Sequence, residues 1–302
     1  PTTIEFVDIA GLVKGASKGE GLGNKFLSHI REVDAIVHLV RCFKDENIVH
    51  VDGNIGPKRD IETINLELIF ADLDVIDRRI EKTKKVAKSG DKKFKDELII
   101  LYKIKELLES NQLLSKKVFS QDEWEFIQQL HLLTSKPTLY IGNVSEDDIS
   151  NLEDNDKIKE LKDYLEEEDT NIIVICAKIE EEIAQLDEDE KQLFLEELGL
   201  LKSGLDMIVE AGYKLLGLIT FITSGPKETK AWTITKGTRA PQAAGKIHTD
   251  FEKGFIRAEV ISYEDMVKAG SSVKAKELGI TRLEGKDYLM KDGDVVLFRF
   301  NV

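Results

Sequence analysis

Polar residues that could bind a phosphate follow an apolar run near the start of the sequence. Asp8 comes directly after Thr3–Val7, a run that predicts a strand, and Gly11 follows three positions later. A carboxylate at the carboxyl end of a strand in an α/β sheet lies where ligands bind, and its oxygen atoms suit Mg²⁺. A glycine lets its backbone N–H approach a γ-phosphate without interference from a side chain. The pair predicts a phosphate and Mg²⁺ site, and an ordinary turn is the alternative interpretation.

A second polar motif follows the apolar run Thr138–Gly142. It consists of Asn143, Val144, Ser145 and Glu146. In translation-factor-type GTPases the corresponding loop is N-K-x-D, whose terminal Asp accepts hydrogen bonds from the N1 and N2 groups of guanine. Val144 and Glu146 replace that Lys and Asp, which argues against guanine because the acceptor must be placed accurately. Adenine offers a donor at N6, and we expect the backbone of Val144 to contact it because the side chain has no polar atom.

A third motif follows the apolar run Asn171–Ile175 and consists of Cys176, Ala177 and Lys178. Its place in the chain matches the S-A-K loop of the same GTPases. We expect these residues to close the base pocket.

The elements that must position these motifs alternate between strands and helices. Asp34–Phe43 is rich in β-branched residues, as is typical of a buried parallel strand, and Asn24–Arg31 before it has helical spacing. A charged helical stretch, Asp156–Glu168, separates the two later apolar runs. This alternation predicts an α/β fold with a parallel sheet.

Residues 59–136 have a different pattern, which predicts a helical insertion. Apolar residues recur at helical spacing from Ile61 to Ile80 and again from Phe94 to Leu108. Ser89–Asp91 is a candidate turn because its glycine supplies a positive φ. The pattern predicts an antiparallel helical hairpin or a short coiled coil, whose charged faces are interpreted as solvated.

From Gly217 onward the sequence is rich in strand patterns. The predicted strands are Leu218–Thr223, Ala231–Thr235, Phe255–Ser262 and a closing hairpin of Tyr288–Met290 and Val295–Phe300. One helix is predicted at Gln242–Lys253. The combination predicts a small α+β domain.

Composition and charge exclude several classes of protein. Of 302 residues, 41% are hydrophobic and 33% are charged, which excludes a disordered chain, and no apolar run is long enough to predict a membrane helix. The two cysteines, Cys42 and Cys176, favour a reduced cytoplasmic protein. The net charge is −14 overall but +3 from Gly217 to Val302, which leaves −17 for the rest. An acidic body is therefore joined to a mildly basic tail.

Taken together, these motifs resemble the YchF/Obg-like ATPase family. The residues that carry the resemblance are Asp8–Val13, Gly15–Leu27, Asn143–Glu146 and Lys246–Glu259. The resemblance covers essentially the whole chain. It implies a P-loop NTPase fold with an Obg-type G domain (residues 1–58 and 137–213), a helical insertion (59–136) and a C-terminal TGS domain of β-grasp type (214–302).

The resemblance also implies an activity, which is ATP hydrolysis as a ribosome-associated switch with ATP preferred over GTP. Its cofactors would be ATP and Mg²⁺. Asp8 would hold Mg²⁺ and Gly11 would contact the γ-phosphate, while Leu12 stands where Ras-like enzymes have the Gln that orients water. His50 is then the implied residue that positions the water.

No G-x-x-x-x-G-K-[ST] sequence occurs in these residues. Gly245-Lys246 and Gly285-Lys286 are the only Gly-Lys pairs, and neither has the required neighbours. We therefore expect the phosphate loop and switch I to precede Pro1 in the intact protein. The 302 residues by themselves are expected to bind nucleotide weakly, because the backbone N–H groups and Lys of that loop are the main cradle for the phosphates.

Ribosomal RNA is the partner that the resemblance implies, through the TGS domain. Basic residues that could neutralise phosphates there are Lys227, Lys230, Lys236, Arg239, Lys246, Lys253 and Arg257. Neither DNA nor a membrane is an expected partner. Two alternatives stay open: a non-catalytic module that binds RNA or the ribosome, and a GTP-specific Obg-type GTPase.

Overall fold

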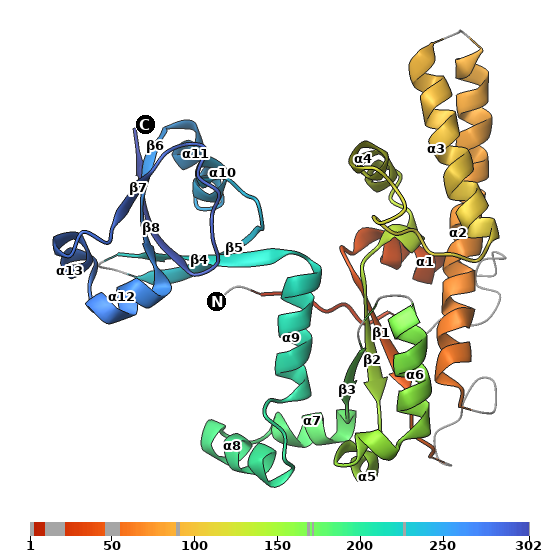
Figure 1. Ribbon diagram of the computed structural model, residues 1–302, viewed down its shortest axis with the longest axis horizontal. Helices are drawn as coiled ribbons and strands as arrows, with labels where there is room; N and C mark the ends of the chain where they lie inside the picture. Colours follow the sequence, from red (N-terminus) through yellow and green to blue (C-terminus); the bar gives the residue numbers. More distant parts are fainter. Residues whose placement is uncertain are drawn as a thin grey trace. The chain divides into compact units, whose positions relative to one another are not determined.

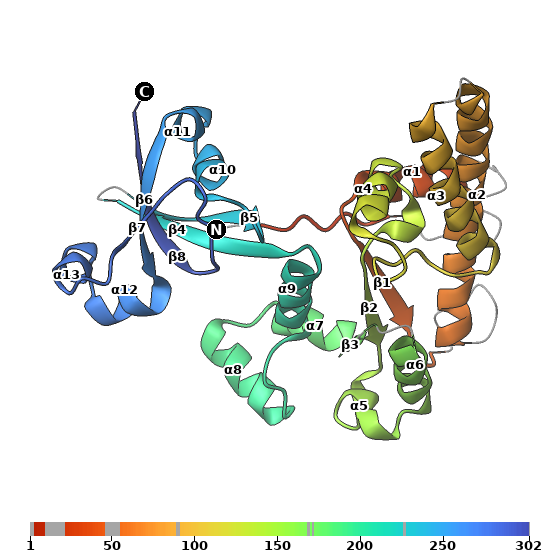
Figure 2. The same ribbon diagram turned by 45° about the horizontal axis from the view of Figure 1, so that its top comes forward.

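The computed structural model describes residues 3–9, 22–45, 55–88, 91–167, 170, 172–225 and 228–301. The chain forms two compact units, one of Val7–Ile208 and the other of Pro1–Phe6 with Val209–Val302. Their helices and strands are labelled in Figures 1 and 2. None of the helices described is both long enough and apolar enough to cross a membrane.

The centre of the Val7–Ile208 unit is a parallel sheet of three strands in the order β1-β2-β3. The strands are β1 (Ile36–Arg41), β2 (Thr138–Asn143) and β3 (Ile172–Ile175). Their apolar side chains form one core with helix α6 (Asp156–Glu167), which contributes Ile158. The parallel α/β sheet predicted from the sequence is confirmed.

Several shorter helices complete this unit. They are α1 (Leu22–Glu32), α5 (Glu146–Ile149), α7 (Ala177–Ile183), α8 (Glu188–Glu197) and the 3₁₀ helices η2 (Leu133–Ser135) and η3 (Leu152–Asp154). Helix α9 (Gly204–Leu215) begins in this unit and continues into the other. Its first turn is held by α7, because the Glu180 carboxylate accepts hydrogen bonds from the backbone N–H groups of Gly204 (2.7 Å) and Leu205 (3.0 Å).

A helical hairpin lies between β1 and β2 in the sequence. Its helices α2 (Pro57–Ala87) and α3 (Lys92–Glu109) run antiparallel (Figure 1) and bury Ile76 and Ile104 between them. The predicted hairpin is confirmed. Residues 89 and 90 of its predicted turn lie outside the described residues.

Two contacts, one after the hairpin and one from it, shape the chain that leads into β2. A capping box at Ser120 and Glu123 starts α4 (Gln121–Gln129), a helix that the apolar periodicity does not separate from its surroundings. The fully buried Asp72 of α2 accepts hydrogen bonds from Leu133 N (3.0 Å), Thr134 N (2.8 Å) and Thr134 Oγ1 (2.8 Å). Asp72 thus fixes η2, and η2 leads directly into β2.

The C-terminal unit is built on a five-stranded sheet in the order β5-β4-β8-β6-β7. The strands are β4 (Leu218–Ser224), β5 (Thr229–Thr235), β6 (Phe255–Ser262), β7 (Arg282–Glu284) and β8 (Asp294–Phe300). Its helices are α10 (Ala240–Gly245), α11 (Thr249–Lys253), α12 (Tyr263–Ala269) and α13 (Ser272–Glu277). Side chains of the sheet and of α10 form one core around Phe221, and the predicted α+β character is confirmed.

The predicted strand Thr3–Val7 is wrong. The described residues 3–9 form neither a strand nor a helix, and Phe6 and Val7 are about half exposed. A strand is held by hydrogen bonds to a neighbouring strand, and the three-stranded sheet ends at β1 and β3 without including this segment.

The predicted closing hairpin is also wrong in its first strand. Residues 288–290 pair with the segment before α10 instead, through Ala240 N to Tyr288 O (2.9 Å) and Met290 N to Thr238 O (3.0 Å). Strand β8 therefore pairs with β6 and β4.

The single helix predicted at Gln242–Lys253 is two short helices, α10 and α11. His248 begins the second, where its Nδ1 accepts a hydrogen bond from Asp250 N (3.2 Å). The two helices approach each other closely at Gly245, where the Cβ of any other residue would clash with the Glu252 carboxylate.

Candidate nucleotide-binding site

The second and third polar motifs meet at the carboxyl edge of the parallel sheet. Asn143 ends β2, and Cys176 follows β3 and precedes α7. The side-chain oxygen of Asn143 accepts a hydrogen bond from Ala177 N at 3.0 Å. This bond brings together two motifs that are 34 residues apart in the sequence.

Val144 is held at this edge by both its backbone and its side chain. Its N–H donates to the carbonyl of Ile175 at 2.9 Å, and its side chain is buried in the core of the sheet. The N–H of Val144 is therefore already used. Any base contact from this backbone must come from the carbonyl oxygen, which is an acceptor and suits the N6 amino group of adenine.

Glu146 forms an ion pair with Lys178 across the same edge. The Lys178 Nζ lies 2.7 Å from Glu146 Oε2, and both side chains are exposed. The hydrogen bond with Glu146 raises the pKa of Lys178 above its ordinary value. Sequence reasoning assigned both residues to the base pocket but missed their pairing, because no local pattern links residues 32 positions apart.

Cys176 differs from the residues around it, since it belongs to the core. Its side chain is buried in the same apolar cluster as Cys42, beneath the strand ends. Burial raises the pKa of Cys42 to about 12. Both thiols are therefore part of the apolar core, whereas the polar side chains of Asn143, Glu146 and Lys178 lie at the edge of the sheet.

Of the predicted phosphate-side residues, only Asp8 lies in the part of the chain that the structure describes. The side chain of Asp8 is exposed, and the side chain of its neighbour Ile9 packs against the apolar cluster that includes Ile30. Gly11, Leu12 and His50 lie outside the described residues. The roles assigned to these four residues stay predictions.

No group of three or more His, Cys, Asp or Glu side chains in the described ranges is arranged to hold a metal ion. Mg²⁺ is usually bound by one or two carboxylates together with the substrate phosphates. The exposed carboxylate of Asp8 has the chemistry for that, so a preformed cage is not required of this chain.

Comparison with known proteins gives matches along the whole chain. Residues 218–301 match the YchF-GTPase_C family model, described as a protein of unknown function, and residues 1–103 match the MMR_HSR1 model, described as a 50S ribosome-binding GTPase. A relative from Bacillus subtilis, named ribosome-binding ATPase YchF, is 55% identical over 302 residues, which are 100% of this chain and 82% of that protein. The chain belongs to the YchF family.

Other members and solved structures agree with this assignment. The YchF proteins of Escherichia coli O157:H7 and Mycoplasma genitalium carry the same name and are 53% and 50% identical to this YchF-family chain, which covers 82% of each. The YchF GTPase of Schizosaccharomyces pombe has a TM-score of 0.86 at 38% identity and is covered to 79%, with 96% of this chain matched. A GTP-binding protein from Pyrococcus horikoshii, at 19% identity and a TM-score of 0.56, shares the fold. The resemblance noted in the sequence is confirmed, as are a P-loop GTPase domain and a YchF-type C-terminal domain.

Proposed function

We propose that this chain belongs to a ribosome-associated nucleoside-triphosphate hydrolase that prefers ATP over GTP and works in the cytoplasm. The observation that carries the proposal is the pairing of Glu146 with Lys178 at 2.7 Å. The carboxylate at the place of the guanine-reading Asp is thereby engaged by a cation. Its capacity to accept from guanine is reduced, since the Lys178 ammonium competes for the same oxygen.

The remaining polar groups at the sheet edge suit adenine. The carbonyl of Val144 would accept from the N6 amino group, and the exposed part of Asn143 would lie beside the ring. Guanine has an oxygen at the position of that amino group, so the same carbonyl would repel it. This asymmetry supports ATP as the preferred nucleotide.

On the phosphate side, the proposal keeps the roles implied by the family. Asp8 would hold Mg²⁺, which neutralises charge on the phosphates, and Gly11 would contact the γ-phosphate. Leu12 has no group that can orient water. The imidazole of His50 would therefore position the attacking water and accept its proton.

The 302 residues contain no G-x-x-x-x-G-K-[ST] sequence. We propose that a polypeptide of these residues alone hydrolyses ATP slowly or not at all. RNA contact is assigned to the C-terminal TGS-type unit, where Lys230, Lys236 and Lys246 could neutralise phosphates. A non-catalytic RNA-binding module is the alternative function of the isolated chain.

The test is a competition titration of ATP against GTP with the protein expressed from its complete coding sequence. The wild type should bind ATP more tightly than GTP. Lys178→Met should reduce the preference for ATP over GTP, because Glu146 would then be released from its ion pair. Lys159→Met removes an exposed charge on α6 and should leave the ratio of ATP to GTP affinity unchanged. Equal affinity for the two nucleotides in the wild type would contradict the proposal.

A further inference from the structure

Charge is segregated along the α2–α3 hairpin. Residues 78–95 contain the last part of α2 and the start of α3. This stretch has nine Lys and Arg residues and two Asp and Glu residues, which gives a net charge of +7. The rest of the two helices, residues 57–77 and 96–109, has four basic and ten acidic residues, a net charge of −6. We call residues 78–88 and 91–95 the basic end of the hairpin. It stands out in a chain of net charge −14.

Among the residues that the structure describes, two of these cations are paired with a carboxylate. Lys84 pairs with Glu81 at 3.1 Å, and Arg79 pairs with Glu97 at 3.3 Å. Across the described part of the chain, no carboxylate pairs with the remaining lysines of the basic end, all of which are exposed: Lys82, Lys85, Lys88, Lys92, Lys93 and Lys95. These charges are available to a partner.

Folding by itself does not favour this arrangement. Lys92 and Lys93 lie in the first turn of α3, where the helix dipole disfavours positive charge. Arg78 with Lys82 and Lys84 with Lys88 are like charges four residues apart, which destabilise a helix. Lys84 and Lys85, in the last turn of α2, interact favourably with the helix dipole, and Lys84 also pairs with Glu81. The cations at the start of α3 require another explanation.

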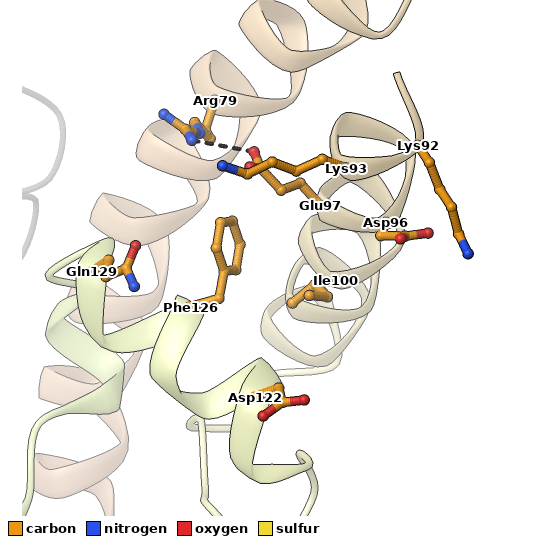
Figure 3. Close-up of a pocket in the computed structure, with 9 residues that line it drawn as sticks. All are labelled: Arg79, Lys92, Lys93, Asp96, Glu97, Ile100, Asp122, Phe126 and Gln129. Carbon is orange, nitrogen blue, oxygen red and sulfur yellow. Dashed lines mark hydrogen bonds and ion pairs between the residues drawn. The ribbon is translucent and has the colours of Figure 1, made fainter. Parts of the chain in front are cut away.

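A groove beside the basic end does not explain the excess of positive charge. It has a volume of about 810 Å³ and lies between α2, α3 and α4, with the ring of Phe126 directed into it (Figure 3). Its charged lining is balanced, with three cations and three carboxylates: Arg79, Lys92, Lys93, Asp96, Glu97 and Asp122. A polyanion is therefore better matched to the outer surface of the basic end than to the groove.

We propose that the basic end of the hairpin binds the phosphate backbone of RNA. Residues 78–88 carry six cations over about 16 Å of helix, or one per about 2.7 Å. This spacing is comparable with that of the phosphates along one nucleic acid strand, which is about 3.4 Å. The side chains are flexible lysines for the most part, which neutralise phosphates without reading sequence. This contact uses residues other than those of the nucleotide site and of the C-terminal unit, and the choice of RNA over other polyanions rests on the proposed function.

The test measures binding of an RNA duplex of about 16 base pairs by fluorescence anisotropy at several salt concentrations. The protein is the full chain, as wild type and as the double variant Lys88→Gln with Lys92→Gln. The variant should bind about tenfold more weakly near 0.1 M salt, and the slope of log K against log salt should fall by about 2. Its melting temperature should stay the same or rise, because like-charge repulsion is relieved.

The matched control is Lys159→Gln with Lys162→Gln, two exposed lysines of α6 with the same change in net charge. The control should keep wild-type affinity for RNA. An unchanged affinity in the Lys88/Lys92 variant, or an equal loss in the control, would overturn the inference. So would tight binding of anionic phospholipid vesicles that the Lys88/Lys92 variant alone loses, since the partner would then be a membrane surface.

Failure of this inference differs from failure of the proposed function. The Lys88/Lys92 variant should keep the wild-type ratio of ATP to GTP affinity. If the wild type binds ATP and GTP equally while its basic end still binds RNA, the proposed function fails and the inference stands. If the wild type prefers ATP and the basic end does not bind RNA, the inference fails and the proposed function stands.

Discussion

Asp72 in the Val7–Ile208 unit and Glu259 in the C-terminal unit are both buried carboxylates, and their surroundings are opposite. Asp72 receives hydrogen bonds from the neutral donors of Leu133 and Thr134. Glu259 on β6 is paired with two cations, Lys276 at 2.5 Å and Arg299 at 2.8 Å. One carboxylate caps a short helix in the interior, whereas the other links α13 and β8 through charge.

The difference appears in the pKa of each group. Burial raises the pKa of Asp72, although the hydrogen bonds from Thr134 and Leu133 oppose the change. The hydrogen bonds from Lys276 and Arg299 lower the pKa of Glu259, against the smaller effect of burial. The charge of the partners, and not burial alone, therefore decides whether the pKa of a buried carboxylate is raised or lowered.

Removal of the interior carboxylate should have the largest effect. Asp72→Ala leaves two buried backbone N–H groups without an acceptor and should lower the free energy of unfolding by about 3 kcal/mol. The loss should appear in urea unfolding followed by the fluorescence of Trp124, which lies in the same unit. Asp74→Ala, at an exposed position on the same helix, should change stability by less than about 0.5 kcal/mol. Equal effects of the two variants would mean that Asp72 does not hold η2.

Removal of the charge on Glu259 should have a smaller effect. Glu259→Gln keeps the shape of the side chain but loses charge-assisted bonds to Lys276 and Arg299, at a cost of about 1–2 kcal/mol. Trp232, in the C-terminal core, is the fluorescent reporter. Glu277→Gln at an exposed position of α13 is the control. If the Glu259 variant is as stable as wild type, the two cations do not contribute net stability.

The two carboxylates should respond to acid in opposite directions. The folded-state pKa of Glu259 is lowered, so its contribution is present above its ordinary value of 4.5 and is lost as the pH falls through the folded-state pKa. The folded-state pKa of Asp72 is raised, so the folded state takes up its proton first and gains stability as the pH falls towards 3.8. The penalty of Glu259→Gln should therefore shrink on acidification and that of Asp72→Asn should grow. Unfolding curves at a series of pH values measure both slopes, and slopes of the same sign would refute the comparison.

Removal of a single cation should have the smallest effect. Lys276→Gln leaves Arg299 on Glu259, and the lysine is about half exposed, so we expect a loss of roughly 0.5 kcal/mol. The double variant with Arg299→Gln should lose more than the two single variants together, because the carboxylate would then be buried without a partner. Strict additivity in that double-mutant cycle would show that the two pairs act independently.

Strong periodicity made much of the fold predictable from sequence. The apolar runs that became β2 and β3 were placed to within a residue or two at each end, and the helical spacing before residue 108 gave both helices of the hairpin. These elements are specified by their own residues. Thr3–Val7 has the same apolar composition, yet it is not a strand here, because pairing depends on a neighbour that its own sequence does not encode.

Contacts between distant residues explain the rest of the differences. The segment 288–290 pairs with residues before α10, and no local signal distinguishes that pairing from a hairpin with β8. The base-side residues were predicted as a group because the GTPase motifs have a known order in the chain. The ion pair of Glu146 with Lys178 and the clamp of Asp72 on η2 join residues 32 and about 61 positions apart, so only the structure reveals them.

The burial of Cys42 and Cys176 has a practical consequence for site-directed labelling. The thiolate is the species that reacts with maleimides and disulfides, and burial raises the pKa of Cys42 to about 12, so that this thiol stays protonated at neutral pH. Cys176 is shielded by its 3% exposure. A cysteine introduced at an exposed position such as Lys88 can therefore carry a single dye in the wild-type background, with both native cysteines left in place.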